Sequence, residues 1–339
     1  MRIEASRTSY MERLKVAMAV EEISQQRTRE ACMARALESL DGLACGDAFG
    51  ECFFDPRNRT AEARVARILP PAPWRFTDDT TMAVSVCACL ERFGGMEPEW
   101  LAESFAHHYD PERGYGHAMN ALLMRLYAIG AANWFEEAQA LFDGEGSFGN
   151  GAAMRVAPVG AYFAYDLNLV VEHATLSAIA THCHPEGIAG AIAVAVAAAV
   201  AWRGREAARP TDATAFLEAV RAHTPEGAVR DGIDRALAIP ASTTTLDTAL
   251  TIGNGARGSA QDTVPFALWS AARSLHNYED ASYEDALWET VNGGGDIDTN
   301  CAIVGGIVAL RAGAGSIPGE WLARREPLSS LLQTATKRD

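Results

Sequence analysis

Two pairs of closely spaced aspartates each stand where an apolar helix is expected to begin. The first pair is Asp78 and Asp79, and the second is Asp296 and Asp298, which follow three glycines. Helix capping accounts for one Asp at each place but not for two. Carboxylates gathered in one pocket raise each other's pKa or bind cations. Oxygen ligands of this kind suit Mg²⁺ or Mn²⁺ rather than Zn²⁺.

A loop of small residues, 146–155, leads from Gly146 to Arg155 and into an apolar segment. Free backbone N–H groups at a helix start can hold a pyrophosphate. A glycine-rich loop is also a common turn, so this segment alone does not identify a phosphate site. Beside the aspartates, the loop fits a polyanionic ligand.

Histidines stand near two of these segments. His182 and His184 lie at an expected helix junction, and His107 and His108 precede the glycine-hinged loop 110–116. The spacing of the first pair lacks the further ligands of a zinc site. A structural or substrate-stacking role is therefore favoured over metal binding.

Helices must position these residues, because apolar side chains recur at i, i+3 and i+4 almost everywhere and alternation with period two is scarce. We predict a single all-α domain. The expected helices span 30–43, 80–93, 99–108, 117–129, 133–142, 169–181, 185–202, 212–223, 225–237, 245–252, 263–274, 283–291 and 300–312.

Charge and composition exclude several classes of protein. The 339 residues carry a formal charge of -15, which disfavours a general nucleic-acid binder and an acidic membrane surface. The longest apolar run, 188–202, is too short to span a bilayer and is typical of a buried helix. Seven cysteines without C-x-x-C spacing indicate reduced thiols in a cytoplasmic protein, with Cys87 and Cys89 in the core.

The first 35 residues differ from the rest of the chain. They hold seven basic and five acidic residues, so this segment is net basic while the remainder is strongly acidic. Met11, Leu14 and Met18 form a modest apolar stripe at helical spacing. Two interpretations stay open: a helix solvated or packed on its own domain, and an arm that docks a partner.

Taken together, six ordered blocks resemble the ADP-ribosyl-glycohydrolase family over about residues 36–312. The blocks are 42–50, 77–80, 113–116, 149–155, 181–185 and 294–299. The resemblance implies an all-α orthogonal bundle with a central cleft that holds two Mg²⁺ ions, with Mn²⁺ as the alternative. It also implies hydrolysis of the bond between ADP-ribose and a modified side chain. We accordingly predict a glycohydrolase domain over 36–325, an extension over 1–35 and a tail over 326–339.

The resemblance also assigns roles to residues. The metal ligands would be Thr77, Asp78, Asp79, Asp296, Asp298 and Thr299. The substrate would be held by Tyr115, Gly116, Ser147, Gly149, Asn150, Gly151 and His182. The catalytic candidates are Asp78, Asp79, Asp298 and Glu51. Many members carry a Glu where this chain has Phe54, with Glu51 and Asp55 nearby, so a neighbour substitutes or the group is absent.

The expected substrate is arginine-linked ADP-ribose, because a guanidine leaves more readily than a serine alkoxide when a general acid is missing. The transition state would have oxocarbenium character, as in other glycoside hydrolysis. Family members that act as immunity proteins against ADP-ribosyltransferase toxins suggest an alternative, in which the 1–35 arm occludes a toxin. A haloacid-dehalogenase-type phosphatase and a terpene-synthase-type lyase fit less well, since the first is α/β and the second needs a further downstream acid.

Overall fold

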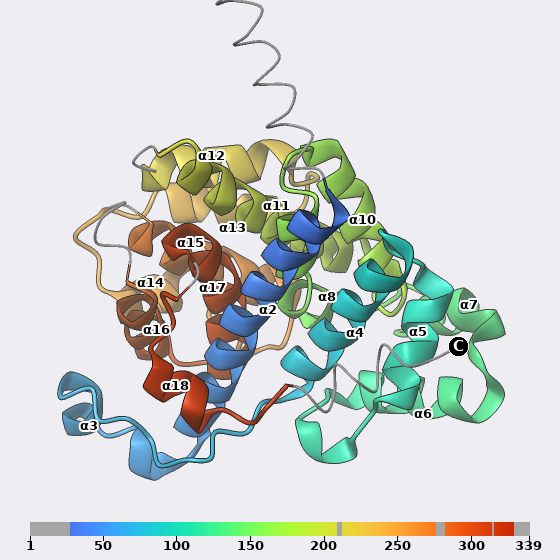
Figure 1. Ribbon diagram of the computed structural model, residues 1–339, viewed down its shortest axis with the longest axis horizontal. Helices are drawn as coiled ribbons and strands as arrows, with labels where there is room; N and C mark the ends of the chain where they lie inside the picture. Colours follow the sequence, from blue (N-terminus) through green and yellow to red (C-terminus); the bar gives the residue numbers. More distant parts are fainter. Residues whose placement is uncertain (1–27, 209–211, 276–281, 314, 329–339) are drawn as a thin grey trace, which may run out of the picture.

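The computed structural model describes residues 28–208, 212–275, 282–313 and 315–328. Within these ranges the chain is helical, and the only extended pairings are two isolated bridges, Trp74 with Arg325 and Gly149 with Ser259. Figure 1 shows helices crossing one another at steep angles around a common core. The predicted all-α orthogonal bundle is therefore confirmed.

The α-helices follow one another with short connections. In chain order they are α2 (Arg29–Glu51), α3 (Ala61–Val65), α4 (Asp78–Phe93), α5 (Pro98–His107), α6 (His117–Ile129), α7 (Trp134–Gln139), α8 (Gly151–Met154), α9 (Ala157–Tyr162), α10 (Leu167–Ile179), α11 (Pro185–Glu206), α12 (Ala213–His223), α13 (Ala228–Leu237), α14 (Thr245–Ile252), α15 (Ala260–Ser274), α16 (Tyr283–Thr290), α17 (Ile297–Ala312) and α18 (Gly319–Arg324).

Helices α2 and α17 pack side by side at the centre (Figure 1) and touch backbone to backbone. A Cβ atom on Gly42 would lie 2.4 Å from the carbonyl oxygen of Gly305, and one on Gly46 would lie 2.1 Å from that of Cys301. Only glycine permits so close an approach. Further along α2, a Cβ on Gly50 would lie 2.7 Å from the Cα of Asp298. This contact brings α2 against the first turn of α17.

Helix α11 is the apolar helix expected from the run at 188–202. It is long and apolar enough to cross a membrane by length and composition alone, but 78% of its most apolar window is buried inside the protein. It packs against α10, α12, α15 and α17. The prediction of a buried core helix is confirmed, as is the burial of Cys87 and Cys89 in α4.

An aromatic cluster fixes the segment that leads to Asp78. The ring of Phe49, on α2, lies within 5.5 Å of the rings of Trp74, Trp288 and Trp321, measured between centroids. The Trp74 amide donates to the Arg324 carbonyl at 2.7 Å, and the Glu326 amide donates to the Trp74 carbonyl at 3.0 Å. The segment that leads into α4 is therefore held by α2, near the start of the described chain, and by residues 321–326, near its end.

Several element boundaries differ from the prediction. Helix α2 does not end at residue 43 but continues to Glu51, and the short helices α8 and α9 were not predicted. The predicted domain boundary after residue 35 falls inside α2, and Leu328, placed in the predicted tail, is buried. Residues 1–27, which make up most of the predicted arm, lie outside the described residues, so the partner-binding role of that arm stays a prediction. So does the cytoplasmic location.

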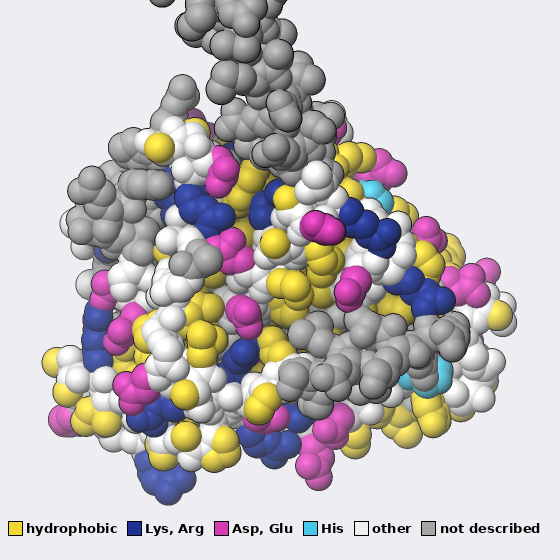
Figure 2. Space-filling view, in the orientation of Figure 1, with side chains coloured by type: hydrophobic (Ala, Val, Ile, Leu, Met, Phe, Trp, Pro, Cys, Tyr) yellow, Lys and Arg dark blue, Asp and Glu magenta, His cyan; other side chains and the backbone are white. Residues whose placement is uncertain are grey.

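The negative charge of the chain is not collected in one surface region on the face shown in Figure 2. Acidic and basic side chains alternate there, with hydrophobic side chains between them. Many of the arginines are paired with carboxylates, as in Arg205 with Glu38 at 2.7 Å and Arg113 with Glu326 at 3.0 Å. The carboxylates of interest are instead those that the fold buries.

Candidate active site

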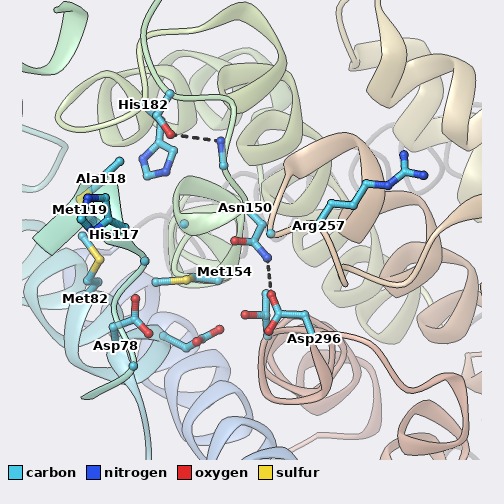
Figure 3. A pocket seen from close by; sticks show the side chains of 18 of the residues that line it. Asp78, Met82, His117, Ala118, Met119, Asn150, Met154, His182, Arg257 and Asp296 are labelled. Atoms are coloured by element: carbon cyan, nitrogen blue, oxygen red, sulfur yellow. Dashed lines mark hydrogen bonds between the residues drawn. The ribbon is translucent and has the colours of Figure 1, made fainter. Parts of the chain in front are cut away.

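The two aspartate pairs, far apart in sequence, meet in one cleft of about 430 Å³. The first turn of α4 and the N-terminus of α17 form its floor, and Figure 3 shows Asp78 and Asp296 facing each other across it. Asn150, which adjoins Asp296, and His182, which lies further from the floor, form a wall of the cleft. Of the predicted site residues, those that line the cleft are Asp78, Asp79, Gly116, Ser147, Gly149, Asn150, Gly151, His182, Asp296, Asp298 and Thr299.

A fifth carboxylate, Asp47 of α2, lies at this floor and was not assigned a role from the sequence. It is fully buried, and its two oxygens accept hydrogen bonds of 2.5–3.1 Å from the backbone and hydroxyl groups of Thr77 and Thr80. Burial raises the pKa of Asp47 to about 6, although these donors oppose the rise. Asp47 therefore anchors the N-terminus of α4 to α2.

Asp47, Asp79 and Asp298 each bring a carboxylate oxygen within 4.8 Å of the other two. The oxygens Asp79 Oδ1 and Asp298 Oδ1 are buried and have no hydrogen-bond partner within the described chain. Buried polar atoms are nearly always satisfied, so orphaned ones call for a partner that the protein itself does not supply. A hard divalent cation is the partner that suits such oxygens.

The position of the Thr77 hydroxyl also indicates a missing cation or proton. Its oxygen lies 2.9 Å from Asp47 Oδ1 and 2.8 Å from Asp79 Oδ2, and it has one proton to give. The carboxylate that does not receive this proton needs a proton of its own or a cation. Thr77 caps α4 and does not itself line the cleft.

The electrostatics of the floor are those of crowded acids. Burial, followed by the charges of Asp47 and Asp296, raises the pKa of Asp78 to about 8. Burial and the neighbouring carboxylates also raise the pKa values of Asp79 and Asp298 well above their ordinary range. A site with this donor set and these raised pKa values fits divalent metal ions, as predicted.

None of the three residues considered for the role of general acid, Glu51, Phe54 and Asp55, lines the cleft. Phe54 is exposed with Arg59 over its ring, and Asp55 is bound by Arg57, which holds the pKa of that carboxyl at about 2. Glu51 is half-buried, and burial together with the charge of Asp47 raises its pKa. Within the described chain, however, Glu51 is not part of the cleft wall.

The 147–151 loop is shaped by internal hydrogen bonds. The Gly149 amide donates to Ser147 Oγ at 3.1 Å, and the Asn150 amide donates to the Gly258 carbonyl at 3.0 Å. These two N–H groups are therefore occupied, contrary to the simple expectation of a loop of free amides. The Asn150 side chain donates to Asp296 Oδ2 at 2.7 Å, which ties the loop to the acidic floor (Figure 3).

His182 completes this wall. The side chain is 3% exposed and lies directly over the loop, since a Cβ atom on Gly151 would meet its ring at 2.9 Å. His184 instead caps α11 by accepting from the Glu186 amide at 3.0 Å, a structural role. His107 bonds to its own helix, so among the described histidines these two take no part in the cleft.

The residues of the 113–116 motif have different roles: Arg113 supports a neighbouring segment, and Gly116 lines the cleft. Arg113 bonds to the Phe76 carbonyl at 2.8 Å and pairs with Glu326, so it holds the segment before α4. The Tyr115 side chain is buried, its hydroxyl has no partner among the described residues, and it does not line the cleft. Gly116 does line it.

Several other residues that line the cleft were not predicted from the sequence. His117 and Met119 follow Gly116 on α6, and Phe142 and Arg257 come from two loops. The 253–259 segment was not identified as a loop from the sequence, although its three glycines, all with positive φ, are a turn signal that could have indicated one. Its contact with the 147–151 loop, through the Gly149 and Ser259 bridge, could not be inferred from either segment alone.

Comparisons with known proteins agree with this geometry. The profile of the ADP-ribosylglycohydrolase family matches residues 28–338. The chain is similar to ADP-ribosylhydrolase ARH3 of Homo sapiens, with 28% identity covering 85% of this chain and 89% of that protein. The Xenopus tropicalis protein of the same name is 30% identical, covering 86% and 91%.

A bacterial relative and a solved structure extend the comparison. ADP-ribosylarginine hydrolase Tri1 of Serratia proteamaculans is 25% identical, covering 89% of this chain and 81% of that protein. A solved structure of an ADP-ribosylglycohydrolase-related protein complex superposes with a TM-score of 0.60 at 24% identity, covering 90% of this chain and 96% of that chain, which supports the fold. The profile match spans most of the chain, and on that ground this protein belongs to the ADP-ribosylglycohydrolase family.

Proposed function

We propose that this protein is a divalent-metal-dependent hydrolase that releases ADP-ribose from modified protein side chains, with arginine as the favoured linkage. One observation carries the proposal: two aspartate pairs meet at the floor of a cleft whose wall offers Asn150, His182 and a small-residue loop. The floor suits cations and ribose hydroxyls, and the wall suits a diphosphate.

The metal would be held by Asp78, Asp79, Asp296 and Asp298, with Thr77 and Thr299 beside them. Two Mg²⁺ ions are proposed, with Mn²⁺ as the alternative, because the orphaned oxygens belong to carboxylates on both α4 and α17. When bound, such ions act as Lewis acids and lower the pKa of a coordinated water. Asp47 supports this set by fixing Thr77 and Thr80.

The phosphate end of the ligand needs donors and positive charge. Ser147, the unoccupied amides at the start of α8 and the His182 ring can donate hydrogen bonds. Arg257 lines the same cleft, and within the described chain its backbone amide is hydrogen-bonded to Asp262 whereas its guanidinium has no hydrogen bond or ion pair. Neutralising the carboxylates at the floor is required before a doubly negative diphosphate can enter.

The nature of the leaving group favours an arginine linkage over a serine linkage. An arginine-linked ribose releases a guanidine, a strong base that is readily protonated, whereas serine-linked ribose must release an alkoxide. The latter needs a general acid, and neither Phe54 nor Asp55 supplies one, while Glu51 stands outside the cleft wall. The name of the Serratia relative, an ADP-ribosylarginine hydrolase, adds support.

The test compares two substrates. The full chain is incubated with one protein ADP-ribosylated on arginine and another on serine, with Mg²⁺ or with EDTA, and released ADP-ribose is quantified. We expect Mg²⁺-dependent release that is faster from arginine. Faster release from serine would overturn the linkage but keep the hydrolase, and no release from either would overturn the proposed function.

A further inference from the structure

A chain of hydrogen bonds links a buried arginine to the cleft histidine. Arg155 is fully buried, and its Nη2 donates to the Ser177 carbonyl at 2.7 Å and to Thr181 Oγ1 at 2.9 Å. Thr181 Oγ1 lies 2.7 Å from Nδ1 of His182. Thr181 is itself fully buried, so solvent does not enter this chain.

The direction of these bonds is fixed at the arginine end. A guanidinium has donors only, so Thr181 Oγ1 must accept from Arg155. The hydroxyl proton of Thr181 then needs an acceptor, and within the described chain Nδ1 of His182 is the one in reach. If Nδ1 carried a proton, the buried Thr181 proton would lose its partner, which disfavours that tautomer about tenfold.

The opposite edge of the ring faces the cleft. Nε2 of His182 makes no hydrogen bond within the described chain, and a Cβ atom on Gly149 would lie 3.2 Å from it. Figure 3 shows the ring above the cleft, on the side of Asn150. A proton on Nε2 would therefore be presented beside the 147–151 loop, where the diphosphate is proposed to bind.

We propose that Arg155 and Thr181 are positioning residues that hold His182 as a neutral imidazole with its proton on Nε2, where it donates a hydrogen bond to a diphosphate oxygen of the substrate. The identity of that ligand rests on the proposed function, whereas the tautomer does not. Burial and the charge of Arg155 lower the pKa of His182 to about 3, which agrees with a neutral ring. In this arrangement His182 recognises an acceptor and takes no part in proton transfer.

Arg155 also has a structural role that the test must separate. Its Nη1 donates to the Gly151 carbonyl at 3.2 Å, and its guanidinium lies 4.4 Å from the centroid of the Phe105 ring. Replacing Arg155 would disturb both contacts. The informative position is Thr181, because Thr181→Val removes the hydroxyl at nearly constant volume, and Thr181→Ser keeps it.

The experiment uses the full chain labelled with ¹⁵N-histidine, and long-range ¹H–¹⁵N spectra identify which ring nitrogen carries the proton. His182→Gln assigns the signals. Thr175→Val is the matched control, since Thr175 of α10 donates to the Val171 carbonyl at 2.8 Å and does not line the cleft. The dissociation constant for ADP-ribose with Mg²⁺ is measured on each variant by calorimetry.

We expect wild type, Thr181→Ser and Thr175→Val to show the Nε2-protonated form from pH 5 to pH 8. Thr181→Val should show a mixture of tautomers and bind ADP-ribose about two- to tenfold more weakly. An Nδ1-protonated His182 in wild type, or an unchanged tautomer and affinity in Thr181→Val, would overturn the proposal. Should Thr181→Val fail to fold, the wild-type and Thr181→Ser spectra decide. Absence of ADP-ribose binding by wild type would count against the proposed function and leave the tautomer result standing.

Discussion

Replacing Asp298 with Asn should stabilise the metal-free protein and remove most of its stabilisation by Mg²⁺. Asp298 is half-buried beside Asp79 and Asp47, and its buried Oδ1 has no hydrogen-bond partner within the described chain. Without a cation, these carboxylates repel each other or bind protons. An amide at position 298 removes one charge and offers an N–H donor to its neighbours.

The size of this stabilisation follows from the distance between the carboxylates. Two unit charges 4.8 Å apart, the upper limit within this triad, interact by about 3–4 kcal/mol at an effective dielectric constant of about 20. Partial protonation relieves some of this repulsion, because burial and like charges raise the pKa of Asp298. We therefore expect the metal-free variant to gain about 1–3 kcal/mol, or about 2–6 °C in melting temperature.

The assay is thermal unfolding in EDTA and across a Mg²⁺ titration. Wild type should melt at a lower temperature than Asp298→Asn in EDTA and should overtake it as Mg²⁺ rises. Asp231→Asn is the matched control, because Asp231 is exposed on α13. Should Asp298→Asn be no more stable than wild type in EDTA, or respond fully to Mg²⁺, the idea of a cation-dependent acidic floor is refuted.

Three further predictions concern the wall of the cleft. Gly151→Ala should weaken ADP-ribose binding at least about tenfold by calorimetry, because the new Cβ would meet the anchored His182 ring at 2.9 Å; Gly319→Ala, with open space around it, should not. Arg257→Ala should weaken binding about three- to tenfold, most at low salt, and the exposed Arg235, which does not line the cleft, provides the control. The lowered pKa of His182 means that the unfolded chain binds the extra proton below about pH 6.5, so stability falls as pH drops. From pH 7.5 to 5.0, wild type should lose about 2 kcal/mol more than His182→Asn in urea unfolding; an equal loss would contradict a buried neutral His182.

Local patterns were sufficient to predict most helices and the two aspartate pairs. Helix α6 begins and ends at the predicted residues, and α14 does as well. These segments have apolar faces with clear helical spacing and are bounded by glycines at their C-terminal ends. Their boundaries depend on neighbours in sequence, which is why a single sequence is enough.

Features that depend on distant contacts could not be predicted in this way. The prediction ended α2 at Leu43, but the helix continues to Glu51. The absence of side chains at Gly42, Gly46 and Gly50 lets α17 pack closely against this part of α2. Asp47 lies in this stretch, and its role became apparent only once α2 was seen to meet the first turn of α4. Likewise, Arg257 has no motif of its own and joins the cleft through a loop-to-loop contact.

If the acidic floor hydrolyses the bond to ADP-ribose only when it holds metal ions, release of ADP-ribose must require both the metal and the floor carboxylates. Full-length protein, stripped with EDTA and then supplied with Mg²⁺, is given an ADP-ribosylated protein, and free ADP-ribose is followed over time for wild type and Asp79→Asn. We predict release by wild type only after Mg²⁺ is restored, and at least about a hundredfold slower release by Asp79→Asn. Undiminished release in EDTA, or by Asp79→Asn, would contradict a metal-dependent hydrolysis at this floor.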